Sequence, residues 1–118
     1  MRMWFVDPRI LCRFHLLGEH VEMHMFQGCI SKKKKIKGYI DKNLCDPKLI
    51  KERHDLLATE MVARKMNHKT PIDENPDCSY LGEDKIIIDM KKSKDDLLSR
   101  CPRCRARLKI LNRIKGGV

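Results

Sequence analysis

The sequence has few aromatic residues and lacks a long apolar run. Only 5% of its 118 residues are Phe, Trp or Tyr, and no apolar stretch approaches the roughly 18 residues of a membrane span. A secretory signal is also missing, because the chain reaches Asp7 and Pro8 before any apolar segment of useful length. These absences argue against a membrane-spanning or secreted protein, so we expect an intracellular one.

Acidic residues are also scarce relative to basic ones. The chain has 16 Asp and Glu against 26 Lys and Arg, which gives a formal net charge of +10. This excess suits a polyanionic partner, with nucleic acid favoured over an anionic membrane. Hydrophobic residues still make up 42% of the chain, enough for a folded protein. We expect a single all-α domain over residues 1–118, with three to four helices.

Proline and capping residues divide the chain into helical stretches. Asp7-Pro8 and Asp46-Pro47 each place a proline at the first turn of a helix. Apolar periodicity predicts helices over residues 8–27, 47–66, 90–100 and 103–113.

The connecting segments are polar or irregular. A basic loop, Lys32–Lys35, follows the first predicted helix, and residues 67–83 have the Pro, Asn and Asp content of a loop. Ile86–Ile88 fits either a short strand or the start of a helix. Ser93 and Asp96 have the spacing of a capping box for the third helix.

The first predicted helix carries a stripe of ionisable residues. At about 100° per residue, His15, Glu19 and Glu22 fall on one face. Carboxylates between apolar margins lose water, which is how carboxyl groups are tuned for acid–base chemistry. The flanking apolar residues are Leu16 and Met23 on one side and Leu11, Phe14, Val21 and Met25 on the other.

The same stripe carries a resemblance to a known family. The segment His15-Leu16-Leu17-Gly18-Glu19-His20-Val21-Glu22 is similar to the His-Leu-(Met/Leu)-(Ala/Gly)-Glu-x-x-Glu segment of pyrimidine-dimer DNA glycosylases. These are small endonuclease V type enzymes of phages, viruses and bacteria. Residues 51–57 and 64–67 resemble a second helix of the family, and the resemblance is strongest over residues 1–70. It implies a DNA-repair protein of a microbe or of a virus-infected cell.

The resemblance implies a glycosylase with abasic-site lyase activity that acts on damaged pyrimidines. The family uses the α-amine of its mature first residue as nucleophile and a glutamate as its acidic partner, which correspond to Met1 and Glu22 here. Arg2 is bulky, so we expect Met1 to be retained, and α-amines have an unperturbed pKa of about 8. We expect His15 and Glu19 to orient Glu22 or the N-terminal segment. The chemistry implied requires no metal or other cofactor.

Several residues are candidates for contact with double-stranded DNA, to which we expect the protein to bind as a monomer. Basic side chains neutralise phosphates, and aromatic rings stack on bases or belong to the core. The candidates for phosphate contact are Arg2, Arg9, Arg13, His20, His24, Lys32, Lys33, Lys34 and Lys35. The aromatic candidates are Trp4, Phe5 and Phe14, and for Phe14 we expect the core.

Two groupings leave other interpretations open. Cys101-Pro102-Arg103-Cys104 is half of a zinc site, which Cys78 or His68 would complete, a redox pair, or two plain thiols. Helical spacing also allows a metal at His15, Glu19 and Glu22, or at His20 and His24, without the H-E-x-x-H pattern. The alternatives to a repair enzyme are a non-catalytic basic DNA-binding protein and a zinc-binding interaction module.

Overall fold

The structure, a computed structural model, describes residues 1–82 and 86–115, and within these ranges it contains helices and no strand. The all-α prediction is therefore confirmed. The α-helices are α1 (Arg13–Ser31), α2 (Lys37–Asp41), α3 (Ile50–Ala63), α4 (Met90–Arg100) and α5 (Pro102–Lys115). Two short 3-10 helices, η1 (Pro8–Ile10) and η2 (Ser79–Leu81), complete the order.

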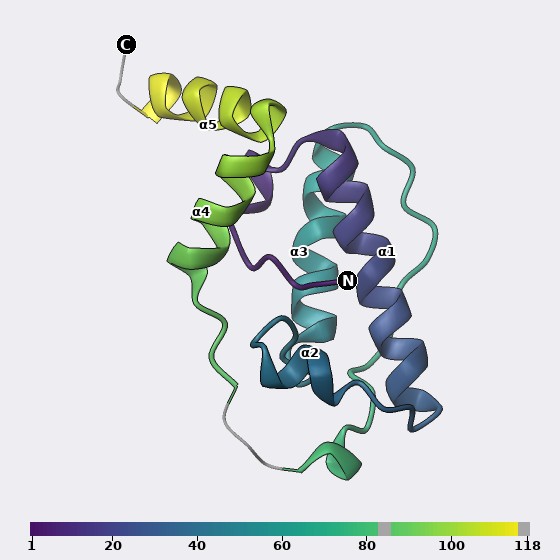
Figure 1. The fold of residues 1–118 in the computed structure, drawn as a ribbon. Helices are drawn as coiled ribbons and strands as arrows, with labels where there is room; N and C mark the ends of the chain where they lie inside the picture. Colours follow the sequence, from purple (N-terminus) through teal and green to yellow (C-terminus); the bar gives the residue numbers. More distant parts are fainter. Residues whose placement is uncertain (83–85, 116–118) are drawn as a thin grey trace.

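Helices α1 and α3 lie side by side in opposite directions and form the centre of the fold (Figure 1). Helix α1 buries one stripe at helical spacing, which contains Leu16, Glu19, His20, Met23, Phe26 and Ile30. The buried residues of α3 are Ile50, Arg53, His54, Leu57, Ala58 and Met61. The interface therefore mixes an apolar core with buried charged and polar groups, and these require partners.

The N-terminal segment starts beside α1 and runs across α3 to α4 (Figure 1). Met3, Trp4 and Val6 are buried in the same core as Leu16 and Leu57. Helix η1 then packs against α5 and α3. The N-terminal segment is thus packed between the α1–α3 pair and α4.

The first two helices begin later than the sequence predicts. Asp7 caps η1, where its side chain accepts from the Arg9 backbone N–H, and the chain is extended again at Leu11 before α1 begins. The N-cap of α3 is Leu49, because Asp46 and the residues after it form a turn of their own. Aspartate followed by proline favours a tight turn as well as a helix start, and here the turn forms.

The C-terminal helices follow the prediction closely. Helix α4 spans the predicted range, but its cap is Asp89, whose side chain accepts from the Lys92 N–H. The expected capping box at Ser93 and Asp96 is wrong, because Ser93 is inside the helix and donates to a distant carbonyl. Ile86–Ile88 lies outside regular structure, and Pro102 starts α5.

The basic loop is confirmed and has a defined backbone. Lys33, just past the end of α1, adopts a left-handed conformation with φ of 54°, as residues after helix ends often do. The Tyr80 hydroxyl donates to the Lys34 carbonyl at 2.7 Å. Among the described residues, no helix has both the length and the apolar character for crossing a bilayer.

Candidate active site

The N-terminus lies beside the Glu22 carboxylate. The Arg2 backbone N–H donates to Glu22 Oε2 at 3.2 Å, and both Met1 and Glu22 are half-buried. Only two backbone atoms separate the Met1 amine from that N–H, so covalent geometry keeps the amine within about 7 Å of the carboxylate. The structure thus brings together the two residues that the sequence predicted as nucleophile and acid–base group.

Backbone hydrogen bonds hold the next residues of the segment. The Met3 N–H donates to the Leu44 carbonyl at 2.6 Å. The Trp4 carbonyl accepts a hydrogen bond from the Ser93 hydroxyl of α4. These contacts tether the segment that carries the amine from both sides, which fixes its path toward Glu22.

Glu19 and Arg53 form a buried ion pair under the same segment. Arg53 Nε lies 2.5 Å from Glu19 Oε2 and Nη2 lies 2.9 Å from Oε1, with both side chains almost fully buried. Arg53 Nη1 also donates to the Val6 carbonyl at 2.7 Å. Burial raises the pKa of Glu19, and the hydrogen bonds from Arg53 oppose that rise. These contacts place Glu19 where it supports the N-terminal segment rather than Glu22.

The Arg2 side chain is engaged within the fold. Its guanidinium lies 4.0 Å from the centre of the Trp4 ring, donates to Ser93 and pairs with Asp96 at 3.7 Å. The side chain is 18% exposed, and burial lowers the pKa of Arg2. The predicted role of Arg2 as a phosphate contact therefore has little support in its placement, and we leave it out of the proposed interface.

His15 lies among cysteines rather than beside Glu22. Its Nδ1 is 3.2 Å from Cys12 Sγ and 3.7 Å from Cys104 Sγ, and its ring packs edge-on against Trp4. These contacts do not connect His15 to the carboxylate stripe. The second apolar margin predicted for that stripe is also largely open, because Phe14, Val21 and Met25 are exposed.

His20 and His24 belong to a cluster of four histidines, with His54 and His68, which we name the histidine cluster. His20 Nε2 and His68 Nε2 lie 3.2 and 3.3 Å from His54 Nε2. Burial, followed by the neighbouring histidines, lowers the pKa of His20 to about 4. Because His20 is only 6% exposed, it offers no surface to a phosphate, contrary to the prediction.

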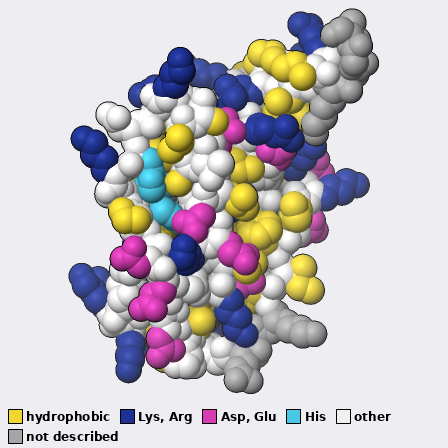
Figure 2. Space-filling view, turned by 180° about the vertical axis from the view of Figure 1, so that it is seen from behind, with side chains coloured by type: hydrophobic (Ala, Val, Ile, Leu, Met, Phe, Trp, Pro, Cys, Tyr) yellow, Lys and Arg dark blue, Asp and Glu magenta, His cyan; other side chains and the backbone are white. Residues whose placement is uncertain are grey.

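The histidine cluster reaches the surface at its edge. His24 and His68 are partly exposed, and Figure 2 shows a strip of histidine atoms on one face of the molecule. Burial also lowers the pKa of His24. A phosphate contact of His24 stays a prediction.

The remaining predicted phosphate contacts are exposed. Arg13 and all of Lys32–Lys35 face solvent, and Figure 2 shows basic side chains around much of the outline of one face. Arg9 is half-exposed and its guanidinium pairs with Asp7 at 2.7 Å, which raises the pKa of Arg9. Positive charge on the surface favours a polyanion.

The aromatic residues divide between core and surface. Trp4 is buried, and Phe5 is half-buried with a left-handed φ of 58°. Phe14 is 65% exposed, and the Arg103 guanidinium lies 4.8 Å from its ring centre. The expectation that Phe14 belongs to the core is therefore wrong, because its ring lies at the surface against the Arg103 guanidinium.

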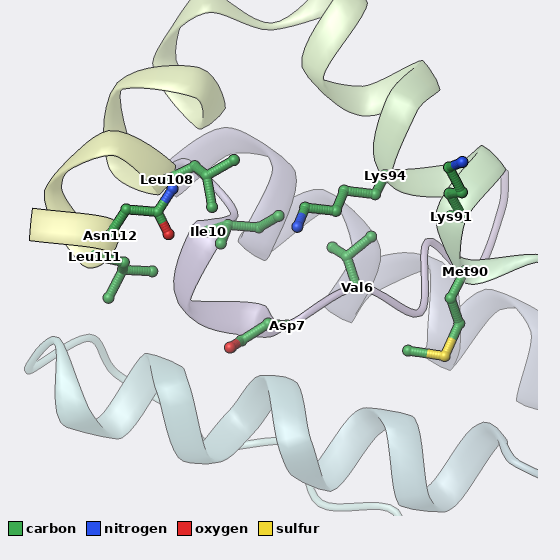
Figure 3. A pocket seen from close by; sticks show the side chains of 9 residues that line it. All are labelled: Val6, Asp7, Ile10, Met90, Lys91, Lys94, Leu108, Leu111 and Asn112. Carbon is green, nitrogen blue, oxygen red and sulfur yellow. The ribbon is translucent and has the colours of Figure 1, made fainter. Parts of the chain in front are cut away.

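A separate pocket lies between the N-terminal region and the last two helices. It has a volume of about 430 Å³. Figure 3 shows Leu108 and Leu111 near Ile10, with Lys94 extending toward it. Neither Met1 nor Glu22 lines this pocket, so we assign it no part in the reaction.

Sequence reasoning missed the residues that support the site from a distance. Arg53, Leu44 and Ser93 each contact the N-terminal segment from another part of the chain. A basic residue on the apolar face of the second predicted helix was the one usable signal, since a buried arginine needs an acidic partner. The serine and the backbone carbonyl gave no such signal.

Fold and site together define a small all-helical, basic protein whose N-terminal amine is held close to a glutamate. The sequence model of the pyrimidine dimer DNA glycosylase family matches residues 1–74 of the chain. The chain therefore belongs to this family of DNA glycosylases, as the resemblance predicted. No curated protein and no solved structure matches it.

Proposed function

We propose that the protein is a DNA glycosylase with abasic-site lyase activity that acts on damaged pyrimidines in double-stranded DNA. The hydrogen bond from the Arg2 N–H to Glu22 carries this proposal, because it sets the Met1 amine near a carboxylate. Membership of the glycosylase family supports it. The proposal requires Met1 to be the first residue of the mature chain, which an intact-mass measurement checks.

The first step uses the amine as a nucleophile. The neutral Met1 amine attacks C1′ of the damaged nucleotide, the base leaves with the electrons of the glycosidic bond, and the protonated amine now bonded to C1′ passes one proton to Glu22. The target nucleotide must be displaced from the duplex for C1′ to be reached. Tethering at Met3 and Trp4 limits the conformations of the amine before substrate binds, which lowers the entropic cost of attack.

The second step uses the carboxylate. Glu22 donates its proton to the ring oxygen O4′, the C1′–O4′ bond breaks, and an iminium forms at C1′. The Glu22 carboxylate then accepts the C2′ proton, and loss of that proton expels the 3′ phosphate by β-elimination. Water hydrolyses the remaining iminium and regenerates the amine. In this scheme Glu19 and Arg53 are positioning residues, because Arg53 pairs with Glu19 and donates to the Val6 carbonyl of the N-terminal segment.

The basic surface binds the DNA backbone in this proposal. The exposed Lys32–Lys35 loop, Arg13 and Arg9 supply the positive charge, and phosphate contacts give affinity without sequence preference. His24 is a further candidate contact at the surface edge of the histidine cluster. We expect the protein to act as a monomer inside the cell.

Borohydride trapping tests the mechanism. The protein is incubated with ultraviolet-irradiated duplex and with abasic duplex in the presence of borohydride, which reduces an iminium to a stable covalent adduct. We expect an adduct on both substrates, with peptide mass spectrometry assigning it to Met1. If DNA binds but no adduct forms on either substrate, the protein is a non-catalytic basic DNA-binding protein. An adduct at a lysine would replace Met1 as the nucleophile.

A further inference from the structure

Cys12, His15, Cys101 and Cys104 converge at the corner between α4 and α5. The four ligand atoms, three sulfurs and one imidazole nitrogen, all lie within 4.8 Å of one another. We name these residues the Cys3His cluster. We propose that the cluster is a structural zinc site that fastens the C-terminal helices to the start of α1.

The interatomic distances fit a tetrahedral ion. Zinc binds sulfur at about 2.3 Å and nitrogen at about 2.0–2.1 Å, so tetrahedral ligands lie about 3.8 Å (sulfur to sulfur) and about 3.6 Å (sulfur to nitrogen) apart. Cys101 Sγ is 3.8 Å from Cys12 Sγ. His15 Nδ1 is 3.7 Å from Cys104 Sγ and 3.2 Å from Cys12 Sγ. The sulfurs are free thiols rather than disulfides.

The ligands come as two pairs, each with two residues between its members. Cys12 is the N-cap of α1 and His15 is in its first turn. Cys101 is the C-cap of α4 and Cys104 is in the first turn of α5. The C-x-x-C motif alone is half of a zinc site, and the fold completes it with a C-x-x-H motif from the opposite end of the chain.

Backbone N–H groups and helix ends favour thiolates in this cluster. The Cys12 N–H donates to Cys104 Sγ at 3.2 Å, and the Cys104 N–H donates to Cys101 Sγ at 3.4 Å. The N-termini of α1 and α5 both begin at the cluster, and their partial positive charge stabilises anions.

Charge and ligand type favour zinc over other ions. Three thiolates, one neutral imidazole and Zn²⁺ sum to one negative charge, and Arg100 and Arg103 border the same hollow as Cys12 and Cys101. Soft sulfur ligands with one imidazole in a closed tetrahedron are typical of structural zinc. Four protein ligands leave no open coordination position for a substrate, which separates this site from catalytic zinc.

The site would position the N-terminal segment through α4. Ser93 and Asp96 on α4 hold the Trp4 carbonyl and the Arg2 guanidinium, and the cluster ties the end of this helix to α1. Cys101 and Cys104 lie outside the region that matches the family. The proposal is independent of the proposed reaction, none of whose steps uses a metal.

Elemental analysis of the purified full chain tests the proposal. The protein is produced in zinc-supplemented medium and purified without chelators, and we expect about one zinc per chain. Cys104→Ser should lose the zinc, whereas Cys78→Ser, at a cysteine outside the cluster, should keep it. His68→Gln should also keep it, because that change affects only the histidine cluster.

Cobalt substitution of the unaltered chain avoids reliance on a variant that fails to fold. Co²⁺ in the cluster should give a thiolate-to-cobalt charge-transfer band and the intense visible bands of tetrahedral cobalt. Less than about half a zinc per chain, together with no thiolate–cobalt band, would overturn the proposal. Zinc that survives Cys104→Ser and is lost in His68→Gln would overturn it as well, and would assign the metal to the histidine cluster.

Discussion

Helix α1 meets two different environments three residues apart. At the α1–α3 interface, Glu19 and His20 face Arg53 and His54, and all four side chains are buried. At the N-terminal edge, where the first residues cross α1, Glu22 is half-buried and accepts from the Arg2 backbone N–H. The two regions contain similar ionisable groups, yet the Glu22 carboxylate is partly exposed whereas the Glu19 carboxylate is buried.

The two regions differ in how many carboxylate oxygens of Glu19 and of Glu22 are hydrogen-bonded to other parts of the protein. Glu19 has both carboxylate oxygens bonded to Arg53, so protonating it or moving it disturbs a buried pair. Glu22 has one oxygen on a backbone N–H. We therefore expect substitutions at the interface to change mainly the free energy of unfolding. We expect substitutions at the edge to change mainly the rate of the proposed reaction.

Blocking the Met1 amine should have the largest effect. Acetylation or a retained N-terminal extension removes the nucleophilic lone pair, so borohydride trapping and strand nicking should both be abolished. A tag of the same size at the C-terminus serves as the control and should leave both intact. Full activity of the blocked protein would remove the amine from the mechanism.

Glu19→Gln should mainly destabilise the fold. The change leaves the Arg53 guanidinium buried without its carboxylate, which costs about 3–5 kcal/mol, and urea denaturation measures this loss. Glu52→Gln, an exposed change on α3, should be neutral within about 0.5 kcal/mol. Equal stability of the two variants would show that the interface does not depend on the pair.

Glu22→Gln should mainly reduce the reaction rate. Loss of the acid–base group should slow nicking by about 10², which corresponds to about 2.7 kcal/mol of barrier. DNA binding and the urea midpoint should stay near those of the unaltered protein. If nicking is unchanged, or if Glu19→Gln slows it equally while remaining fully folded, the division between edge and interface is wrong.

Acid should weaken the α1–α3 interface through His20. Its folded pKa of about 4 lies below the ordinary value of 6.5, so its contribution to stability is complete above pH 6.5 and is lost as the pH falls toward 4. The loss should reach about 2 kcal/mol at pH 5. The groups that face it are His24, His54 and His68, and His54 also contacts Asp55. His20→Gln should flatten the urea-derived profile between pH 7 and pH 5, and an unchanged slope would contradict the assignment.

The basic loop should show the smallest effect per residue and belongs to neither region. Changing Lys32–Lys35 to Ala should weaken binding equally for damaged and undamaged duplex, because phosphate contacts do not read the lesion. The dependence of affinity on salt should become shallower by roughly 0.9 for each phosphate that the variant no longer neutralises. Fluorescence anisotropy over a salt series measures both quantities. Weaker binding of damaged DNA alone would show that the loop reads the lesion.

Much of the secondary structure was predictable from local signals. Apolar periodicity placed α4 over residues 90–100 as observed, and the second predicted helix contains α3. The predicted starts of the first two helices were wrong, because an aspartate followed by a proline is compatible with either a tight turn or a helix start. At Asp7 the chain forms a 3-10 turn, and α1 begins only at Arg13, because packing of η1 against α3 and α5 decides between the alternatives.

The candidate site was predictable only in part. The resemblance to the glycosylase family indicated the pair of Met1 and Glu22, and the structure places the N-terminus close to the Glu22 carboxylate. The roles predicted for His15 and His20 depended on helix geometry alone. Helix geometry shows which residues share a face, but not what covers that face, and here cysteines cover one and histidines cover the other.

The sequence by itself determined the helical class, the excess of positive charge and membership of a DNA glycosylase family, because composition, periodicity and local motifs are properties of neighbouring residues. The tertiary structure alone decided the partners of residues distant in sequence. Glu19 meets Arg53 from 34 residues away, and Cys12 meets Cys101 from 89 residues away. These pairings follow from how α1, α3 and the α4–α5 corner pack, because buried charges and thiols take the partners that packing brings within bonding distance.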